Sequence, residues 1–177
     1  MSTTQSQALP AGTWVVDTVH SSVAFAIDYM AGTFTGTFSD VDAGVADGVL
    51  NGRAKVASIQ VKDRNLEAHL LSPEFFDADR YPELTFTTDD VRRDGETITV
   101  DGEITMKGHT EPVEITGAIS EPIADPYGGE RFGLRLEAVV DRDRFGISWN
   151  NPLPSGLLAL SNDVRIIADL QLVKQEA

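Results

Sequence analysis

The chain has 177 residues, of which 28 are acidic and 14 basic, and a formal net charge of −14 at pH 7. This length suits one compact domain, and the negative charge argues against nucleic acid or an anionic membrane surface as a partner. The sequence contains no cysteine, which excludes disulfides, thiolate metal sites and cysteine nucleophiles.

The N-terminal segment differs in composition from the rest of the chain. Residues 1–11 are rich in Ser, Thr and Gln and contain neither the basic nor the apolar region of a signal peptide. We therefore expect a disordered leader over 1–11 and one domain over 12–177. No apolar run in the sequence is long enough to span a membrane as a helix. These features predict a soluble, cytoplasmic protein.

Short alternating segments fill the first half of the domain. Val23, Phe25 and Ile27 alternate with smaller or polar residues, and Phe34 and Phe38 alternate with threonines. This period of two is typical of strands with one buried face. The predicted strands span residues 14–16, 22–29, 33–47 and 49–60.

One stretch interrupts the strand pattern. Residues 64–78 read RNLEAHLLSPEFFDA, with apolar residues at helical spacing and a proline at position 73. This pattern predicts one or two short helical turns, interrupted at Pro73. Such a helix could plug or gate one end of a barrel.

The second half returns to strands, predicted over 84–92, 96–107, 112–123, 131–142 and 163–174. Glycine-containing turns at 93–95 and 107–109 and a longer loop at 125–129 separate the first of these. Residues 149–161 form a further irregular segment with Pro152, Pro154, Leu157 and Leu158. An apolar, proline-rich loop of this kind is often functional.

The strands have no helix of ordinary length to cover them, so they must close on one another. We predict an all-β fold, either a sandwich or a barrel, and a barrel of about eight strands can be solid or can hold a small apolar ligand. The phenylalanines could simply fill the core. Small residues at Ala31, Gly36, Gly102, Gly117 and Gly133 could instead thin the interior.

Catalytic motifs are missing from the sequence. It contains no G-x-S-x-G, no H-E-x-x-H, no phosphate loop and no dinucleotide fingerprint. Its three histidines, His20, His69 and His109, are spread along the chain without metal-ligand spacing. They are interpreted as structural or exposed residues, with two alternatives: a ligand-headgroup contact by His20 or His69, or a metal bound by a pair.

Three segments carry a family resemblance. They are WVVDTVHSSVAF at 14–25, HLLSPEFFD at 69–77 followed by YPELTF at 81–86, and VDGEITMKGHTEPV at 100–113; RFGI at 144–147 is a weaker fourth. Together they resemble, in order, the YceI-like family of polyisoprenoid-binding proteins. The resemblance implies a single lipocalin-like antiparallel barrel of about eight strands, often a homodimer, whose lumen takes the tail of a long isoprenoid or similar amphiphile.

We therefore expect a non-catalytic protein that binds, stores or transports an isoprenoid, quinone or fatty-acid-like lipid, with no metal and no cofactor besides that lipid. The expected apolar lumen and portal residues are Phe25, Ile27, Phe34, Phe38, Phe75, Phe76, Phe86, Ile104, Ile115, Phe132, Leu134, Leu157 and Leu158. The expected headgroup contacts are His20, Ser21, His69 and Asn150. Two alternatives stay open: an enzyme acting on a lipid headgroup with His20 or His69 as base, and a stress-related protein-interaction module with a solid barrel.

Overall fold

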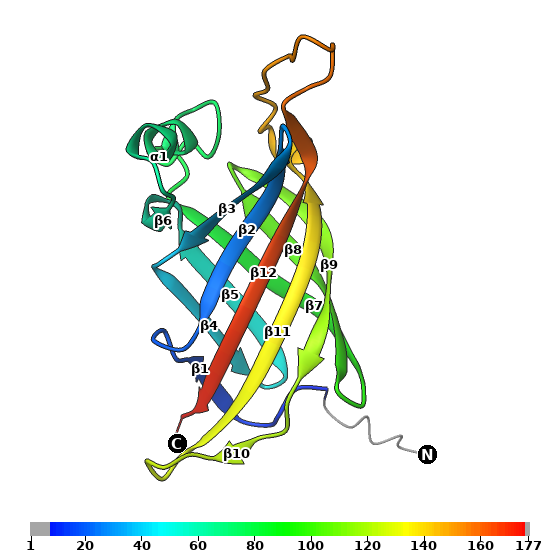
Figure 1. The fold of residues 1–177 in the computed structure, drawn as a ribbon. Helices are drawn as coiled ribbons and strands as arrows, with labels where there is room; N and C mark the ends of the chain where they lie inside the picture. The colour runs from blue at the N-terminus through cyan, green and yellow to red at the C-terminus, as the bar shows by residue number, and fades with distance from the viewer. Residues whose placement is uncertain (1–7, 176–177) are drawn as a thin grey trace.

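The computed structural model describes residues 8–175, which form one curled antiparallel sheet with a short helix at one end (Figure 1). The predicted all-β barrel is confirmed. In chain order the elements are β1 (Thr13–Val16), β2 (Ser22–Tyr29), β3 (Gly32–Phe38), β4 (Val41–Ala46), β5 (Val49–Lys55), η1 (Val56–Ser58), β6 (Ile59–Gln60), α1 (Arg64–Leu71), β7 (Glu83–Asp94), β8 (Thr97–Met106), β9 (His109–Ile119), β10 (Ile123–Ala124), β11 (Glu130–Asp141), η2 (Arg142–Phe145) and β12 (Leu160–Lys174).

The sheet closes into an eight-stranded barrel because β11 pairs with both β9 and β12. Some positions around the barrel are filled by two strands in tandem: β1 pairs with the C-terminal part of β12, and β2 with the part before it. β3 and β4 likewise follow each other, so the single strand predicted over 33–47 is broken. At the break, the Ser39 N–H donates to Ser58 and the Lys55 N–H donates to Asp40.

The β9–β11 seam is short. Only Thr116–Ile119 of β9 pairs with Leu134–Glu137 of β11, and the rest of β9 has β8 as its partner. The two backbones approach so closely that a Cβ added at Gly117 would overlap the carbonyl oxygen of Arg135. A glycine is therefore required at this crossing.

Helix α1 begins and ends where its sequence predicts. The Asp63 carboxylate accepts hydrogen bonds from the Asn65 and Leu66 N–H groups, as an N-cap does. The helix ends at Leu71, and the Ser72 hydroxyl donates to the His69 carbonyl at 2.6 Å. The proline at position 73 cannot continue the helical hydrogen bonds.

Apolar side chains form two separate clusters inside the barrel. We call them the upper cluster, at the α1 end, and the lower cluster, at the end where β1 begins and β12 ends (Figure 1). The lower cluster contains Leu9, Trp14, Val16, Ala43, Val45, Leu50, Ile98, Val100, Ile119, Phe132, Leu134, Leu136, Leu170 and Leu172. The Trp14 and Phe132 rings meet edge to face with centroids 4.8 Å apart.

The described part of the expected leader packs on the barrel. Residues 1–7 lie outside the described range, but Leu9 is only 1% exposed and belongs to the lower cluster. Trp14 donates its indole N–H to the Ala11 carbonyl at 3.0 Å. The expectation of disorder is therefore wrong for residues 8–11, because the buried Leu9 side chain and the hydrogen bond to the Ala11 carbonyl hold this segment on the barrel.

Candidate functional site

A cavity of about 450 Å³ occupies the upper half of the barrel. Inward-pointing side chains of most barrel strands line it, and they are almost all apolar. Small residues at Ala54, Ala138 and Ala168 leave space between the larger ones. The lining residues are Val23, Ala24, Phe25, Ile27, Tyr29, Phe34, Phe38, Val41, Ala43, Leu50, Gly52, Arg53, Ala54, Leu66, His69, Leu70, Phe75, Phe76, Leu84, Thr85, Phe86, Ile104, Met106, Ile115, Leu136, Ala138, Val140, Arg142, Ile147, Trp149, Leu160, Val164, Ile166, Ala168 and Leu170.

The floor of the cavity is the lower cluster. Leu50, Leu136 and Leu170 belong to both the cavity lining and that cluster. Below them, Trp14 and Phe132 are buried and do not reach the cavity. The void is therefore a blind pocket rather than a tunnel through the whole barrel.

Two strand glycines seat phenylalanine rings and do not widen the cavity. A Cβ added at Gly36 would lie 2.6 Å from the Phe25 ring, and one added at Gly102 would lie 2.8 Å from the Phe86 ring. Both rings lie in the cavity wall. The prediction that these glycines thin the interior is thus wrong, because each glycine is covered by a neighbouring ring.

Aromatic side chains from α1 and two loops meet at the upper end of the cavity. The His69 ring makes edge-to-face contacts with Phe75 and Trp149, each with centroids 4.8 Å apart. Its Nε2 lies 2.6 Å from a Glu74 carboxylate oxygen. This cluster joins the helical segment to the loop before β12, so the two together form a roof over the cavity.

Lys107 ties this roof to the barrel. Its ammonium donates to the Pro73 carbonyl at 2.6 Å and to the Gly146 carbonyl at 3.3 Å. Lys107 and Gly108 both have positive φ in the tight turn between β8 and β9, as a two-residue hairpin requires. The turn therefore holds both roof segments at one point.

Arg142 is a charged residue in the otherwise apolar wall. It is 3% exposed, and its guanidinium donates to the backbone carbonyls of Ser161, Ile147 and Trp149. Desolvation by burial lowers the pKa of this guanidinium, while the charges of Asp143 and Asp141 act in the opposite direction. An arginine nevertheless stays protonated, so a full positive charge is held next to the cavity.

The structure places most of the predicted apolar residues in the cavity lining. They are Phe25, Ile27, Phe34, Phe38, Phe75, Phe76, Phe86, Ile104 and Ile115. Phe132 and Leu134 point inward but lie in the lower cluster instead. Leu157 and Leu158 are 69% and 60% exposed on the loop before β12 and do not line the cavity. The structure therefore does not bring Phe132 and Leu134 to the site, and it places Leu157 and Leu158 on the roof loop, outside the lining.

Of the predicted headgroup residues, only His69 lines the cavity. Asn150 lies near the roof, but its side chain hydrogen-bonds the Leu160 N–H and carbonyl, which shapes the loop. Ser21 bonds the backbone of Gln171. Ser21 and His20 belong to the turn between β1 and β2, which lies at the end of the barrel away from α1 (Figure 1).

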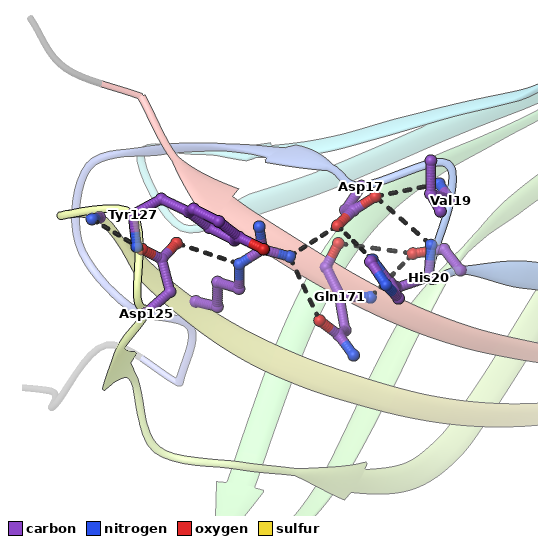
Figure 2. Close-up of polar contacts among 9 residues, drawn as sticks. Asp17, Val19, His20, Asp125, Tyr127 and Gln171 are labelled. Atoms are coloured by element: carbon purple, nitrogen blue, oxygen red, sulfur yellow. Dashed lines mark hydrogen bonds and ion pairs between the residues drawn. The ribbon is translucent and has the colours of Figure 1, made fainter.

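His20 belongs to a polar cluster that joins the β1–β2 turn to β11 and the loop before it (Figure 2). Asp17 accepts from Arg131 at 2.6 Å and lies 2.8 Å from the His20 Nδ1. Arg131 also donates to Asp125 at 3.0 Å. The hydrogen bonds from His20 and then Arg131 hold the pKa of the Asp17 carboxyl well below its usual range. The cluster is thus a structural clasp.

This clasp makes stability depend on pH. A carboxyl with a lowered pKa in the folded state stabilises the fold above its unfolded pKa of about 3.9, and the contribution is lost as the pH falls below that value. Asp17→Asn should therefore lower the thermal midpoint at pH 7, and the difference from wild type should shrink as the pH drops below about 4. Asp89→Asn, at an exposed position, is the control; equal midpoints for all three proteins at pH 7 would contradict the clasp.

Among the lining residues that were not predicted from the sequence are the buried arginine Arg142 and the roof residue Trp149. Arg142 stands in a run of alternating acidic and basic residues, DRDR at 141–144, which is typical of a solvated surface. Nothing in that local pattern indicates burial. For Trp149, the only sequence signal was the presence of a large aromatic residue at the start of the irregular segment 149–161.

Within residues 8–175, no group of three or more metal-ligating side chains is close enough to hold an ion. The β1–β2 turn that carries His20 and the helix α1 that carries His69 lie at different ends of the barrel (Figure 1). The His109 Nδ1 is 2.9 Å from the Lys107 carbonyl. Over the same residues, no helix has the length and apolar character needed to cross a membrane.

The sequence matches the YceI-like domain over residues 14–172, nearly the whole barrel. The chain belongs to the YceI-like family. A UPF0312 protein of Photorhabdus laumondii is 31% identical over 129 residues, which cover 68% of this chain and 67% of that protein. Protein YceI of Shigella flexneri is 28% identical over 165 residues, covering 89% of this chain and 83% of the relative.

Solved structures share the YceI-like fold. BcnA of Burkholderia cenocepacia superposes with a TM-score of 0.72 at 21% identity, covering 90% of this chain and 99% of that chain. A polyisoprenoid binding domain from Saccharophagus degradans, implicated in plant cell wall breakdown, gives a TM-score of 0.71 at 12% identity and covers 92% of this chain and 98% of its own. At these identities the likeness shows a common fold.

Proposed function

We propose that this YceI-like protein holds the tail of an amphiphilic lipid, such as an isoprenoid, a quinone or a fatty-acid-like molecule, in the upper cavity for storage or transport, without catalysis. The observation that carries the proposal is the blind apolar cavity of about 450 Å³. Its volume lies within the roughly 300–1,000 Å³ of typical small-molecule sites. The description of the Saccharophagus degradans domain as polyisoprenoid binding supports the same ligand class.

The physical basis is burial of the tail. Each methylene transferred from water into an apolar site contributes about 0.8 kcal/mol. A tail in contact with the lining phenylalanines and alanines therefore needs no specific polar contact for affinity. The alternative of a solid barrel requires side chains to fill the upper half of the barrel. The cavity of about 450 Å³ lies in that half.

Native mass spectrometry of freshly purified protein tests the proposal. We expect the measured mass to exceed that of the polypeptide by one lipid per chain, and organic extraction should release that lipid. The same spectrum tests the predicted homodimer. The matched control is protein stripped by extraction and then incubated with a polyprenol or a long-chain quinone. Protein that is empty as purified and takes up neither lipid would reject the proposal, and a lipid returned chemically altered would favour an enzyme.

Tryptophan fluorescence should report filling of the cavity. The chain has two tryptophans: Trp149 lies in the cavity lining, and Trp14 lies in the lower cluster. Adding a polyprenol to stripped protein should shift the emission of wild type and of Trp14→Phe. Trp149→Phe, which keeps only Trp14, should bind lipid without a comparable shift. An emission shift in Trp149→Phe, which retains only Trp14, would mean that the ligand binds outside the upper cavity.

A further inference from the structure

Arg142 has hydrogen-bond donors that the fold leaves unused. An arginine side chain carries five N–H donors. Here the Nε donates to Ser161 at 2.8 Å, and the Nη1 donates to Ile147 at 2.8 Å and to Trp149 at 2.7 Å. The Nη2 is buried and has no partner within residues 8–175. Buried donors, above all charged ones, are costly to leave unpaired.

The flanking carboxylates do not satisfy this nitrogen. Asp141 and Asp143 lie next to Arg142 in the chain and influence it through charge. The Asp141 carboxylate, however, accepts from the Asp143 N–H at 3.0 Å and caps η2. The charges of Asp141 and Asp143 therefore act on the guanidinium, while its Nη2 is buried without a hydrogen-bond partner.

Arg142 is also distinctive among the cavity-lining residues. The other lining arginine, Arg53, has a half-exposed side chain that pairs with Asp42 and Glu83. His69 lies 2.6 Å from Glu74. Within the described lining, Arg142 alone combines a permanent charge, near-complete burial and an unpaired donor.

Its position suits a headgroup and not a tail tip. Arg142 begins η2, directly after β11 at the α1 end of the barrel (Figure 1), and it hydrogen-bonds the backbone of the roof residue Trp149. The floor residues Leu50, Leu136 and Leu170 lie deeper, next to the lower cluster. A ligand with its tail on this floor would carry its polar end toward the roof.

We infer that Arg142 is the polar anchor of the site and that its Nη2 donates to an oxygen of the ligand, which is therefore an amphiphile with a carboxylate or carbonyl head. The inference rests on the proposed lipid-binding function and specifies its ligand class. Because arginine has only donors, it selects an acceptor and repels a cationic amine. A carboxylate would form the stronger, charge-assisted bond and a quinone-type carbonyl the weaker one.

Stripped protein titrated with palmitate, methyl palmitate and hexadecylamine tests this anchor, with intrinsic fluorescence or calorimetry as the measure of affinity. The three probes have the same tail and differ in the head. We expect palmitate to bind about tenfold or more tighter than the amine, which corresponds to about 1.4 kcal/mol. A palmitate affinity well above that of the methyl ester would identify an anionic head. Equal affinities for palmitate and the methyl ester would identify a carbonyl head.

Two further measurements separate the anchor from a structural role. Arg142→Met should remove the preference for the acid over the amine while tail binding persists, and Arg142→Lys should keep it in part. Because these variants lose backbone contacts and can fail to fold, carboxyl-labelled palmitate should also be titrated by ¹³C NMR on wild type. A guanidinium contact lowers the pKa of the bound carboxyl, whereas an apolar site without one raises it.

The outcomes are distinguishable. Equal affinity for all three probes, or a raised carboxyl pKa in the complex, would overturn the Arg142 anchor and leave the lipid-binding function standing. Failure of all three probes, of polyprenol and of quinone to bind would reject the proposed function itself.

Discussion

Replacing Gly117 by alanine should destabilise the barrel more than any other single methyl group added to it. A Cβ at this position would overlap the Arg135 carbonyl oxygen, which belongs to the backbone and cannot rotate away. The strands β9 and β11 would have to separate where their short pairing closes the barrel. Overpacking typically costs about 1–3 kcal/mol, and we expect about 3 kcal/mol or more here.

Urea denaturation with the same substitution at Gly32 as the control measures this cost. Gly32 also begins a strand pairing, β2 with β3, but nothing lies within 4 Å of a Cβ added there. Gly32→Ala should therefore stay close to wild type. If Gly117→Ala unfolds at the same urea concentration as Gly32→Ala, the close crossing of β9 and β11 does not exist in solution.

A second large effect is expected from filling the cavity at Ala138. This residue is buried on the inner face of β11 and lines the void, so a phenylalanine there would occupy empty space. Ala138→Phe should retain or raise the thermal midpoint while displacing part of the lipid tail. Losing room for about two methylenes, at about 0.8 kcal/mol each, weakens binding by about tenfold or more.

The matched control is Val139→Phe, one residue along the same strand. Val139 is exposed on the outer face, so the same ring is added without entering the cavity. Lipid affinity measured on stripped protein should fall for Ala138→Phe and stay unchanged for Val139→Phe. Unchanged affinity in a folded Ala138→Phe would mean that the lipid binds outside the barrel.

The strands and turns could be predicted because their signals are local. Alternation over 22–29 matches β2 at both ends, and the glycine turns before β8 and β9 lie where expected. β9 begins before its expected start at Pro112, since this part of β9 pairs only with β8 and tolerates a proline at its free edge. The broken strand over 33–47 depends on contacts with Ser58 that lie far along the chain.

The height of each side chain in the barrel could not be predicted in the same way. Phe25 and Phe132 stand in equally regular alternating segments, yet one lines the cavity and the other fills the lower half. Strand tilt and stagger decide the level at which an inward residue ends. The buried guanidinium of Arg142 depends on three carbonyls that the loop brings together.

The filled lower half of the barrel also limits the length of chain that the cavity can hold. In the proposed function, Leu50, Leu136 and Leu170 would stop a tail at a fixed depth, so a longer chain would have to emerge between the roof segments. The depth of this floor then sets the tail length that fits in the cavity. Related barrels with smaller residues at these three inward positions would accept longer tails.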